Sequence, residues 1–169
     1  MCIRDRHLMI ISPDEGAMQR AVYFSNILGV DMGMFYKRRD YSTVVNGKNP
    51  IVAHEFLGDS VEGKDVIVID DMISSGDRKA KRVIVCATFG LFTDGLEKFD
   101  EFYEKEYIHK VITTNLNYKN PDILTRPYYL EADMSKYLAS IMDILNHDLS
   151  VEKVRSTTEK INQLLRRYS

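Results

Sequence analysis

Several residue types are scarce in this 169-residue chain, and each scarcity excludes a class of protein. The chain has no tryptophan, four prolines and two cysteines, Cys2 and Cys86. Two cysteines without metal-ligand spacing argue against a zinc site or a disulfide framework, and we expect a reducing, cytoplasmic compartment. No apolar run has the length of a membrane span, and the first residues lack the apolar core of a secretory signal. We therefore expect no membrane partner.

Strong charge of one sign is also missing. The net charge is −2 at pH 7, and the basic residues are scattered except at Lys37-Arg38-Arg39 and Arg166-Arg167. Such a balance provides no general attraction for a polyanion, so nucleic acid is not an expected partner. The length suits a single ordinary hydrophobic core.

Apolar strands alternate with amphipathic helical segments along most of the chain. This alternation is typical of an α/β fold, and it predicts a doubly wound, mostly parallel sheet with flanking helices. We expect helices over 17–28, 94–107 and 134–146, and a helical C-terminal tail. The expected strands are Leu8–Ser12, Asp31–Tyr36, His54–Gly58, Lys64–Asp71, Arg82–Thr88, Lys110–Asn115 and Tyr128–Glu131.

The most informative segment is Val66–Asp77. Four apolar residues lead directly into Asp70-Asp71, and the small, hydroxyl-rich turn Ser74-Ser75-Gly76-Asp77 follows. Carboxylates at a strand end can bind sugar hydroxyls, and backbone amides of such a turn can bind a phosphate. The segment predicts a sugar-phosphate site, with ordinary strand-end carboxylates as the alternative.

Two further segments carry candidate site residues. Asp14 follows the first strand and precedes the first helix, so it could hold a cation, cap the helix, or do both. Lys37 and Arg39 begin the polar segment 37–50, which we expect to be a long mobile loop. Their cations would suit a phosphate-rich substrate, and a solvated loop tip is the alternative.

Taken in order, these motifs resemble ribose-phosphate pyrophosphokinase and, more broadly, the type I phosphoribosyltransferase fold. Ser12–Gly16 resembles the family's Ser-Pro-Asp-x-Gly turn, Lys37–Arg39 its basic catalytic loop, and Val66–Asp77 its ribose-phosphate signature. Ala87–Gly90 and Thr113–Asn115 follow in the family's order. The resemblance divides the chain into a leader (1–7), a phosphoribosyltransferase-like domain (8–148) and a C-terminal helical tail (149–169).

The resemblance implies an activity and assigns roles within it. The reaction is transfer of the diphosphoryl group of Mg-ATP to ribose 5-phosphate, which gives phosphoribosyl pyrophosphate and AMP. ATP and ribose 5-phosphate are the implied partners, and Mg²⁺ is the implied cofactor. The roles are catalysis for Lys37 and Arg39, metal binding for Asp14, and ribose 5-phosphate binding for Asp70, Asp71, Ser74, Ser75, Gly76 and Asp77.

The sequence departs from the family pattern in two places. It corresponds to the second half of a typical member, and only Met72–Lys81 joins two strands that should be parallel neighbours, a connection that usually contains a helix. The resemblance thus implies a truncated member with an internal deletion, which would leave part of the sheet without apolar cover. Two other functions remain open, a phosphoribosyltransferase that consumes phosphoribosyl pyrophosphate and a non-catalytic regulatory subunit. The family's hexamers imply a homo-oligomer.

Overall fold

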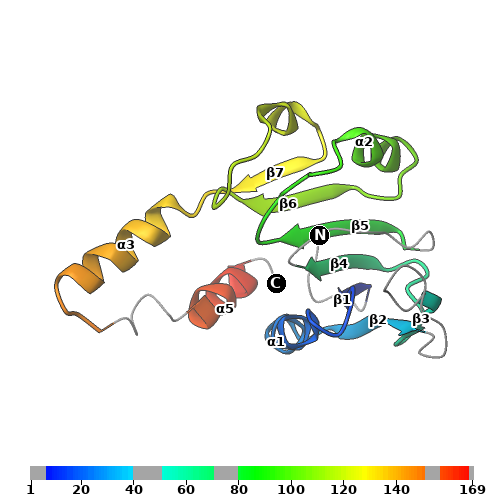
Figure 1. Cartoon of the computed structure of the whole chain (residues 1–169). Helices are drawn as coiled ribbons and strands as arrows, with labels where there is room; N and C mark the ends of the chain where they lie inside the picture. Colours follow the sequence, from blue (N-terminus) through cyan, green and yellow to red (C-terminus); the bar gives the residue numbers. More distant parts are fainter. Residues whose placement is uncertain (1–6, 40–50, 71–79, 151–156, 168–169) are drawn as a thin grey trace.

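A computed structural model describes residues 7–39, 51–70, 80–150 and 157–167, which form one seven-stranded sheet with helices on both faces (Figure 1). The strand order is β3-β2-β1-β4-β5-β6-β7, and every pair is parallel except β2 with β3. The α/β, doubly wound prediction is confirmed. The strands are β1 (Leu8–Ser12), β2 (Asp31–Arg39), β3 (Ile51–Leu57), β4 (Asp65–Asp70), β5 (Arg82–Ala87), β6 (Lys110–Thr114) and β7 (Tyr129–Ala132).

The helices occupy the connections and the C-terminal part of the chain. Gly29, in the left-handed region, ends the first of them. A 3₁₀ helix, η1, precedes β7 and was not predicted. The helices are α1 (Met18–Leu28), α2 (Glu97–Glu104), η1 (Pro121–Thr125), α3 (Ser135–Asn146) and α5 (Thr157–Arg167).

The two faces of the sheet bury different residues. One face, which includes Met9, Val66 and Val83, forms the larger core, against which Phe99 and Phe102 of α2 pack. The opposite face carries Ile10 and Ile69, and helix α1 covers it over β1 and β2. We call this second face the α1 face. Alternating side chains of β1 and β4 therefore reach two separate cores.

The segment that joins β2 and β3 differs from its prediction. Lys37, Arg38 and Arg39 continue β2 and pair antiparallel with β3, so the expected loop begins too early, and the strand expected from His54 already begins at Ile51. Residues 40–50 lie outside the described part of the chain. Hydrogen bonding between the two strands extends the sheet past the predicted boundary, which the polar composition of 37–39 did not indicate.

At the base of the β2–β3 hairpin, two glycines lie where a larger residue would clash with its neighbours. A Cβ added to Gly33 would meet the Phe56 ring at 2.4 Å, and one added to Gly58 would approach the Gly33 Cα at 2.9 Å. Gly58 also has a φ of 146°, which disfavours other residues. The two strands thus meet in close contact where they leave the sheet.

β4 and β5 are parallel neighbours in register from Asp65–Arg82 to Asp70–Ala87, as predicted. Ala80, just before β5, packs against the larger core, and the Lys81 amide donates to the Lys64 carbonyl at 2.8 Å. None of the helices in the described residues has the length and apolar character needed to cross a membrane.

Candidate functional site

The carboxyl ends of the parallel strands define the candidate site. β1 pairs in parallel with β2 on one side and β4 on the other, so the residues after β1 and the end of β4 share one edge of the sheet. Ligands of open α/β sheets bind at this edge, next to the strand where the order reverses. Here that strand is β1, because the chain moves from β1 outward to β2 and β3 and then returns to β4.

Asp14 is positioned by the turn from β1 into α1. The buried Ser12 hydroxyl donates to the Asp14 carbonyl at 2.6 Å, and the Ala17 amide donates to Asp14 Oδ1 at 3.1 Å. Oδ1 of Asp14 therefore holds the turn that precedes α1, but the N-cap of α1 itself is Ala17, and no side chain caps the helix. No hydrogen bond to Oδ2 is found in the described part of the chain, so this oxygen fits the single-carboxylate binding usual for Mg²⁺.

Asp70 ends β4 one strand away from this turn. Its side chain is half-buried, and it lies at the register position of Ala87 on β5. The parallel pairing of β1 with β4 accounts for this placement, because Ile11 lies opposite Val68 and both strands end within two residues of that pair. The structure thus brings the Asp14 turn and Asp70 to the same edge of the sheet.

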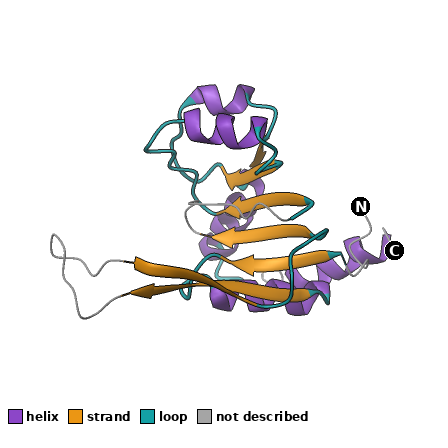
Figure 2. Ribbon diagram, turned by 90° about the vertical axis from the view of Figure 1, so that its right-hand side faces the viewer, coloured by secondary structure: helices purple, strands orange, loops and turns teal. Residues whose placement is uncertain are grey.

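Lys37 and Arg39 lie on the part of β2 that projects past this edge. Ser12, the last residue of β1, pairs with Met34, so these two positions are three and five residues farther along β2. At about 3.3 Å per residue, they extend roughly 10 to 17 Å beyond the end of β1. Figure 2 shows the β2–β3 hairpin projecting on the side to which the parallel strands point. Asp71, Ser74, Ser75, Gly76 and Asp77 lie outside the described residues.

The same edge of the sheet includes the ends of β5 and β6, where hydrogen bonds connect the segments that follow the two strands. The Thr114 hydroxyl donates to the Thr88 carbonyl at 2.5 Å, and the Asn117 amide group donates to the Gly90 carbonyl at 3.1 Å. These bonds fix the loop after β5 against the end of β6. A shallow hollow lined by residues 89–95 and Phe99 lies on this loop.

Lys119 is a nearly buried cation that sequence reasoning missed. Its side chain is 7% exposed; it donates to the Thr114 carbonyl at 2.8 Å, forms an ion pair with Glu131, and lies 5.7 Å from the centre of the Tyr129 ring. Tyr129 in turn bonds Thr113 at 2.8 Å. Burial opposes the charged form, but the contacts with Glu131 and Tyr129 outweigh it and raise the pKa of Lys119.

Asn115 joins the end of β6 to the start of α3. Its amide group donates to Asp133 Oδ1 at 2.8 Å and to Ser135 Oγ at 3.2 Å, while its Oδ1 accepts from the Met134 amide at 2.9 Å. Asp133 also accepts from the Ser135 amide, and hydrogen bonds from Ser135 and Asn115 lower the pKa of Asp133. The side chain of Asn115 thus fixes the direction in which α3 leaves the sheet.

Comparisons with known proteins agree with this fold. Residues 3–89 match the family model of the phosphoribosyl transferase domain, and the chain belongs to that family. Within it, the chain is similar to ribose-phosphate pyrophosphokinases: those of Aquifex aeolicus and Pyrococcus furiosus are 33% and 32% identical over 118 residues, which is 63% of this chain. The resemblance noted from the motifs is therefore confirmed.

A solved structure supports the same relationship over more of the chain. Phosphoribosylpyrophosphate synthetase from Mycobacterium smegmatis matches 85% of this chain with a TM-score of 0.67 and 25% identity. The matched part is 46% of that protein, and the chain spans 35% to 40% of the length of the two curated relatives.

Proposed function

We propose that this chain carries the ribose 5-phosphate and diphosphate part of a ribose-phosphate diphosphokinase site. The observation that carries the proposal is the parallel pairing of β1 with β4, which brings Asp14 and Asp70 to one edge of the sheet. The Lys37 and Arg39 positions project past that edge on β2. The similarity to ribose-phosphate pyrophosphokinases supplies the reaction class.

In the proposed reaction, the anomeric hydroxyl oxygen of ribose 5-phosphate forms a bond to the β-phosphorus of ATP. The bond between that phosphorus and the oxygen bridging it to the α-phosphate breaks, AMP leaves, and the proton of the anomeric hydroxyl is released to solvent. Such a transfer depends on positioning and on neutralising charge. We assign the neutralising role to Lys37 and Arg39, whose cations would approach the transferred group from the hairpin.

The remaining roles follow the chemistry of each group. Asp70 and Asp71 would accept hydrogen bonds from the ribose hydroxyls, and the amides of Ser74, Ser75, Gly76 and Asp77 would bind the 5-phosphate. Asp14 would hold Mg²⁺ through Oδ2 while Oδ1 keeps its bond to Ala17. When bound, Mg²⁺ would reduce the negative charge of the ATP phosphates.

Calorimetry with ribose 5-phosphate tests the binding part of this proposal. We expect the wild-type chain to bind the sugar phosphate, and Asp70→Asn to weaken binding at least about tenfold, since it removes a charge-assisted hydrogen bond. Asp122→Asn, an exposed carboxylate on η1, is the matched control and should bind normally. Absence of binding by the wild-type chain, or equal binding by Asp70→Asn, would refute the assignment.

Turnover is a separate measurement. The chain is incubated with ribose 5-phosphate, ATP and Mg²⁺, and AMP is measured without any nucleobase. AMP formation supports the diphosphokinase. Sugar-phosphate binding without AMP would restrict this chain to the binding part of the reaction, and product formed only when a nucleobase and phosphoribosyl pyrophosphate are supplied would indicate a phosphoribosyltransferase.

A further inference from the structure

Ser12 carries a buried hydroxyl group directly before the Asp14 turn. It is the last residue of β1, and it is fully shielded from water. β2 and β4 flank β1 on its two sides, with Ser12 opposite Met34, so the sheet holds the backbone of Ser12 in place. Its hydroxyl donates to the Asp14 carbonyl at 2.6 Å. Because a buried hydroxyl without a partner is costly, Ser12 strongly favours the conformation of the turn in which this bond forms.

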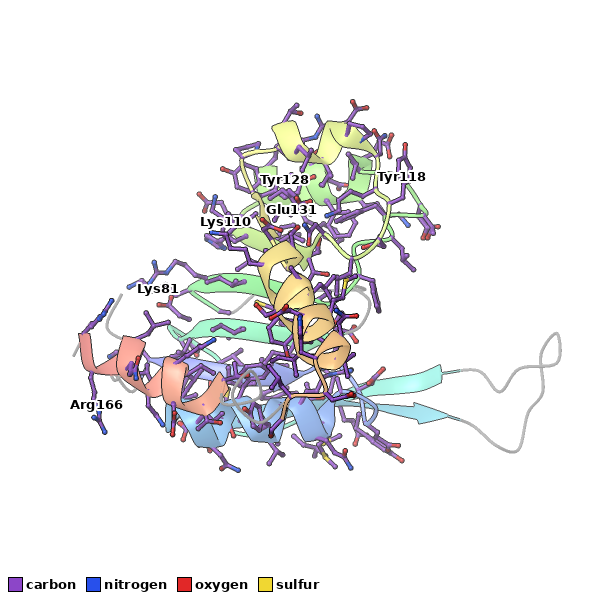
Figure 3. The ribbon with its side chains drawn as sticks, turned by 90° about the vertical axis from the view of Figure 1, so that its left-hand side faces the viewer. Lys81, Lys110, Tyr118, Tyr128, Glu131 and Arg166 are labelled. Carbon is purple, nitrogen blue, oxygen red and sulfur yellow. The ribbon has the colours of Figure 1, made fainter. Side chains whose placement is uncertain are left out.

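The bond lies where the chain bends out of the sheet. Figure 3 shows α1, α3 and α5 in front of the α1 face of the sheet, so the chain must turn between the end of β1 and the start of α1. Pro13 restricts the backbone in this turn and has no amide hydrogen to donate. The side chain of Ser12 therefore supplies the hydrogen bond that closes the first half of the bend.

The carboxylate of Asp14 holds the second half of the bend. Its Oδ1 accepts from the amide of the buried Ala17 at 3.1 Å, and a Cβ added to Gly16 would lie 3.3 Å from the same oxygen. The carboxylate thus has one oxygen bonded and little space on the side of Gly16. Its position depends on the Asp14 backbone, and that backbone is the part that Ser12 holds.

We propose that Ser12 is a positioning residue for Asp14, which fixes the main chain from which this carboxylate reaches Mg²⁺ and the diphosphate group. The inference rests on the proposed function, in which Oδ2 of Asp14 holds the metal. A carboxylate that is already ordered binds more tightly, because its freedom is not lost when the ligand arrives. Ser12 is fully buried, so its effect reaches the ligand only through Asp14.

Calorimetry with magnesium pyrophosphate tests the effect on binding. Ser12→Ala should weaken this binding about fivefold, as expected for the loss of one hydrogen bond, and should leave ribose 5-phosphate binding unchanged, since Asp70 lies on another strand. In an Asp14→Ala background, Ser12→Ala should have no further effect. Ser25→Ala is the matched control, because Ser25 is a buried hydroxyl on α1 that donates to the Val22 carbonyl at 3.2 Å. Its loss should leave both affinities unchanged.

Amide hydrogen exchange followed by NMR tests the positioning without any ligand. Ser12→Ala should accelerate exchange of the Ala17 amide, because its bond to the Asp14 carboxylate loosens. The amide of Ile11, within β1, should exchange as slowly as in the wild type. Acceleration at both positions would indicate general destabilisation and would overturn the positioning role.

The two measurements separate failure of this inference from failure of the proposed function. Unchanged magnesium pyrophosphate binding by Ser12→Ala, unchanged Ala17 exchange, or an equal further loss in the Asp14→Ala background would overturn the role of Ser12. Faster Ala17 exchange in Ser12→Ala, together with no pyrophosphate binding by the wild-type chain, would support the hold of Ser12 on Asp14 and refute the assignment of Asp14 to Mg²⁺.

Discussion

Replacing Lys119 with methionine tests whether its ion pair holds the loop after β6 in place. Methionine keeps most of the apolar stem but removes the bond to the Thr114 carbonyl, the pair with Glu131 and the contact with the Tyr129 ring. A hydrogen bond to a charged group contributes about 1.5 to 3 kcal/mol. Glu131 is 35% exposed, so water can replace part of what it loses, and we place the total near the lower end.

We therefore expect Lys119→Met to reduce the free energy of unfolding by about 2 kcal/mol and the melting temperature by about 4 to 8 °C. Urea denaturation and a thermal melt measure these changes. Lys105→Met is the control, because Lys105 pairs with Glu101 on the surface of α2 and both side chains are 53% exposed. The control should cost no more than about 0.5 kcal/mol.

A double-mutant cycle with Glu131→Gln isolates the ion pair itself. Because Lys119 is almost fully shielded from water, we expect a coupling energy of about 1 kcal/mol, above the usual value for exposed pairs. If Lys119→Met costs no more than Lys105→Met, or if the coupling is below about 0.3 kcal/mol, the reasoning about this buried cation is wrong.

Three further results are expected. The hydrogen bond from Arg82 lowers the pKa of Asp65. The pair therefore stabilises the fold above the unfolded pKa of about 3.9, and this stabilisation is lost as the pH falls through the lower pKa of the folded state. In urea denaturation, Asp65→Asn should be destabilising at pH 6 and should differ less from wild type at pH 3. Burial raises the pKa of Cys86 to about 11, so in a Cys2→Ser background a thiol reagent at pH 8 should label it slowly until the protein unfolds, and fast labelling of the native protein would contradict this. Gly58→Ala should reduce the free energy of unfolding by about 1 to 3 kcal/mol, because the backbone of Gly58 is in the left-handed region and Gly33 lies close. Urea denaturation measures this, and an unchanged midpoint would refute it.

Most of the sheet could be predicted because the positions of apolar residues along the sequence indicate which strand residues are buried. Leu8–Ile11 is a continuous apolar run, and these four residues and Ser12 are all buried. The extension of β2 over Lys37–Arg39 could not be predicted, since its cause is pairing with β3 and the side chains there are polar. The same limit applies to η1, which Asn120 caps through the Asp122 amide.

The positions around the candidate site could also be predicted only in part. The placement of Asp14 and Asp70 at one edge could be predicted because Asp14 lies two residues after β1, Asp70 ends β4, and parallel strands end at the same edge. Lys119 carried no such signal. It lies in the loop between β6 and η1, and only the tertiary structure brings it to Thr114, Tyr129 and Glu131, which are five to twelve residues away along the chain.

The close contact of Gly33, Phe56 and Gly58 fixes the base of the β2–β3 hairpin. From Gly33 to Arg39 the ribbon is roughly 20 Å long, so a tilt of about 10° at its base displaces the far end by about 3 Å. Because β2 and β3 are hydrogen-bonded along this length, such a tilt would carry the Lys37 and Arg39 backbone together. A change in the angle of the hairpin would thus move the two basic positions by the same amount and in the same direction.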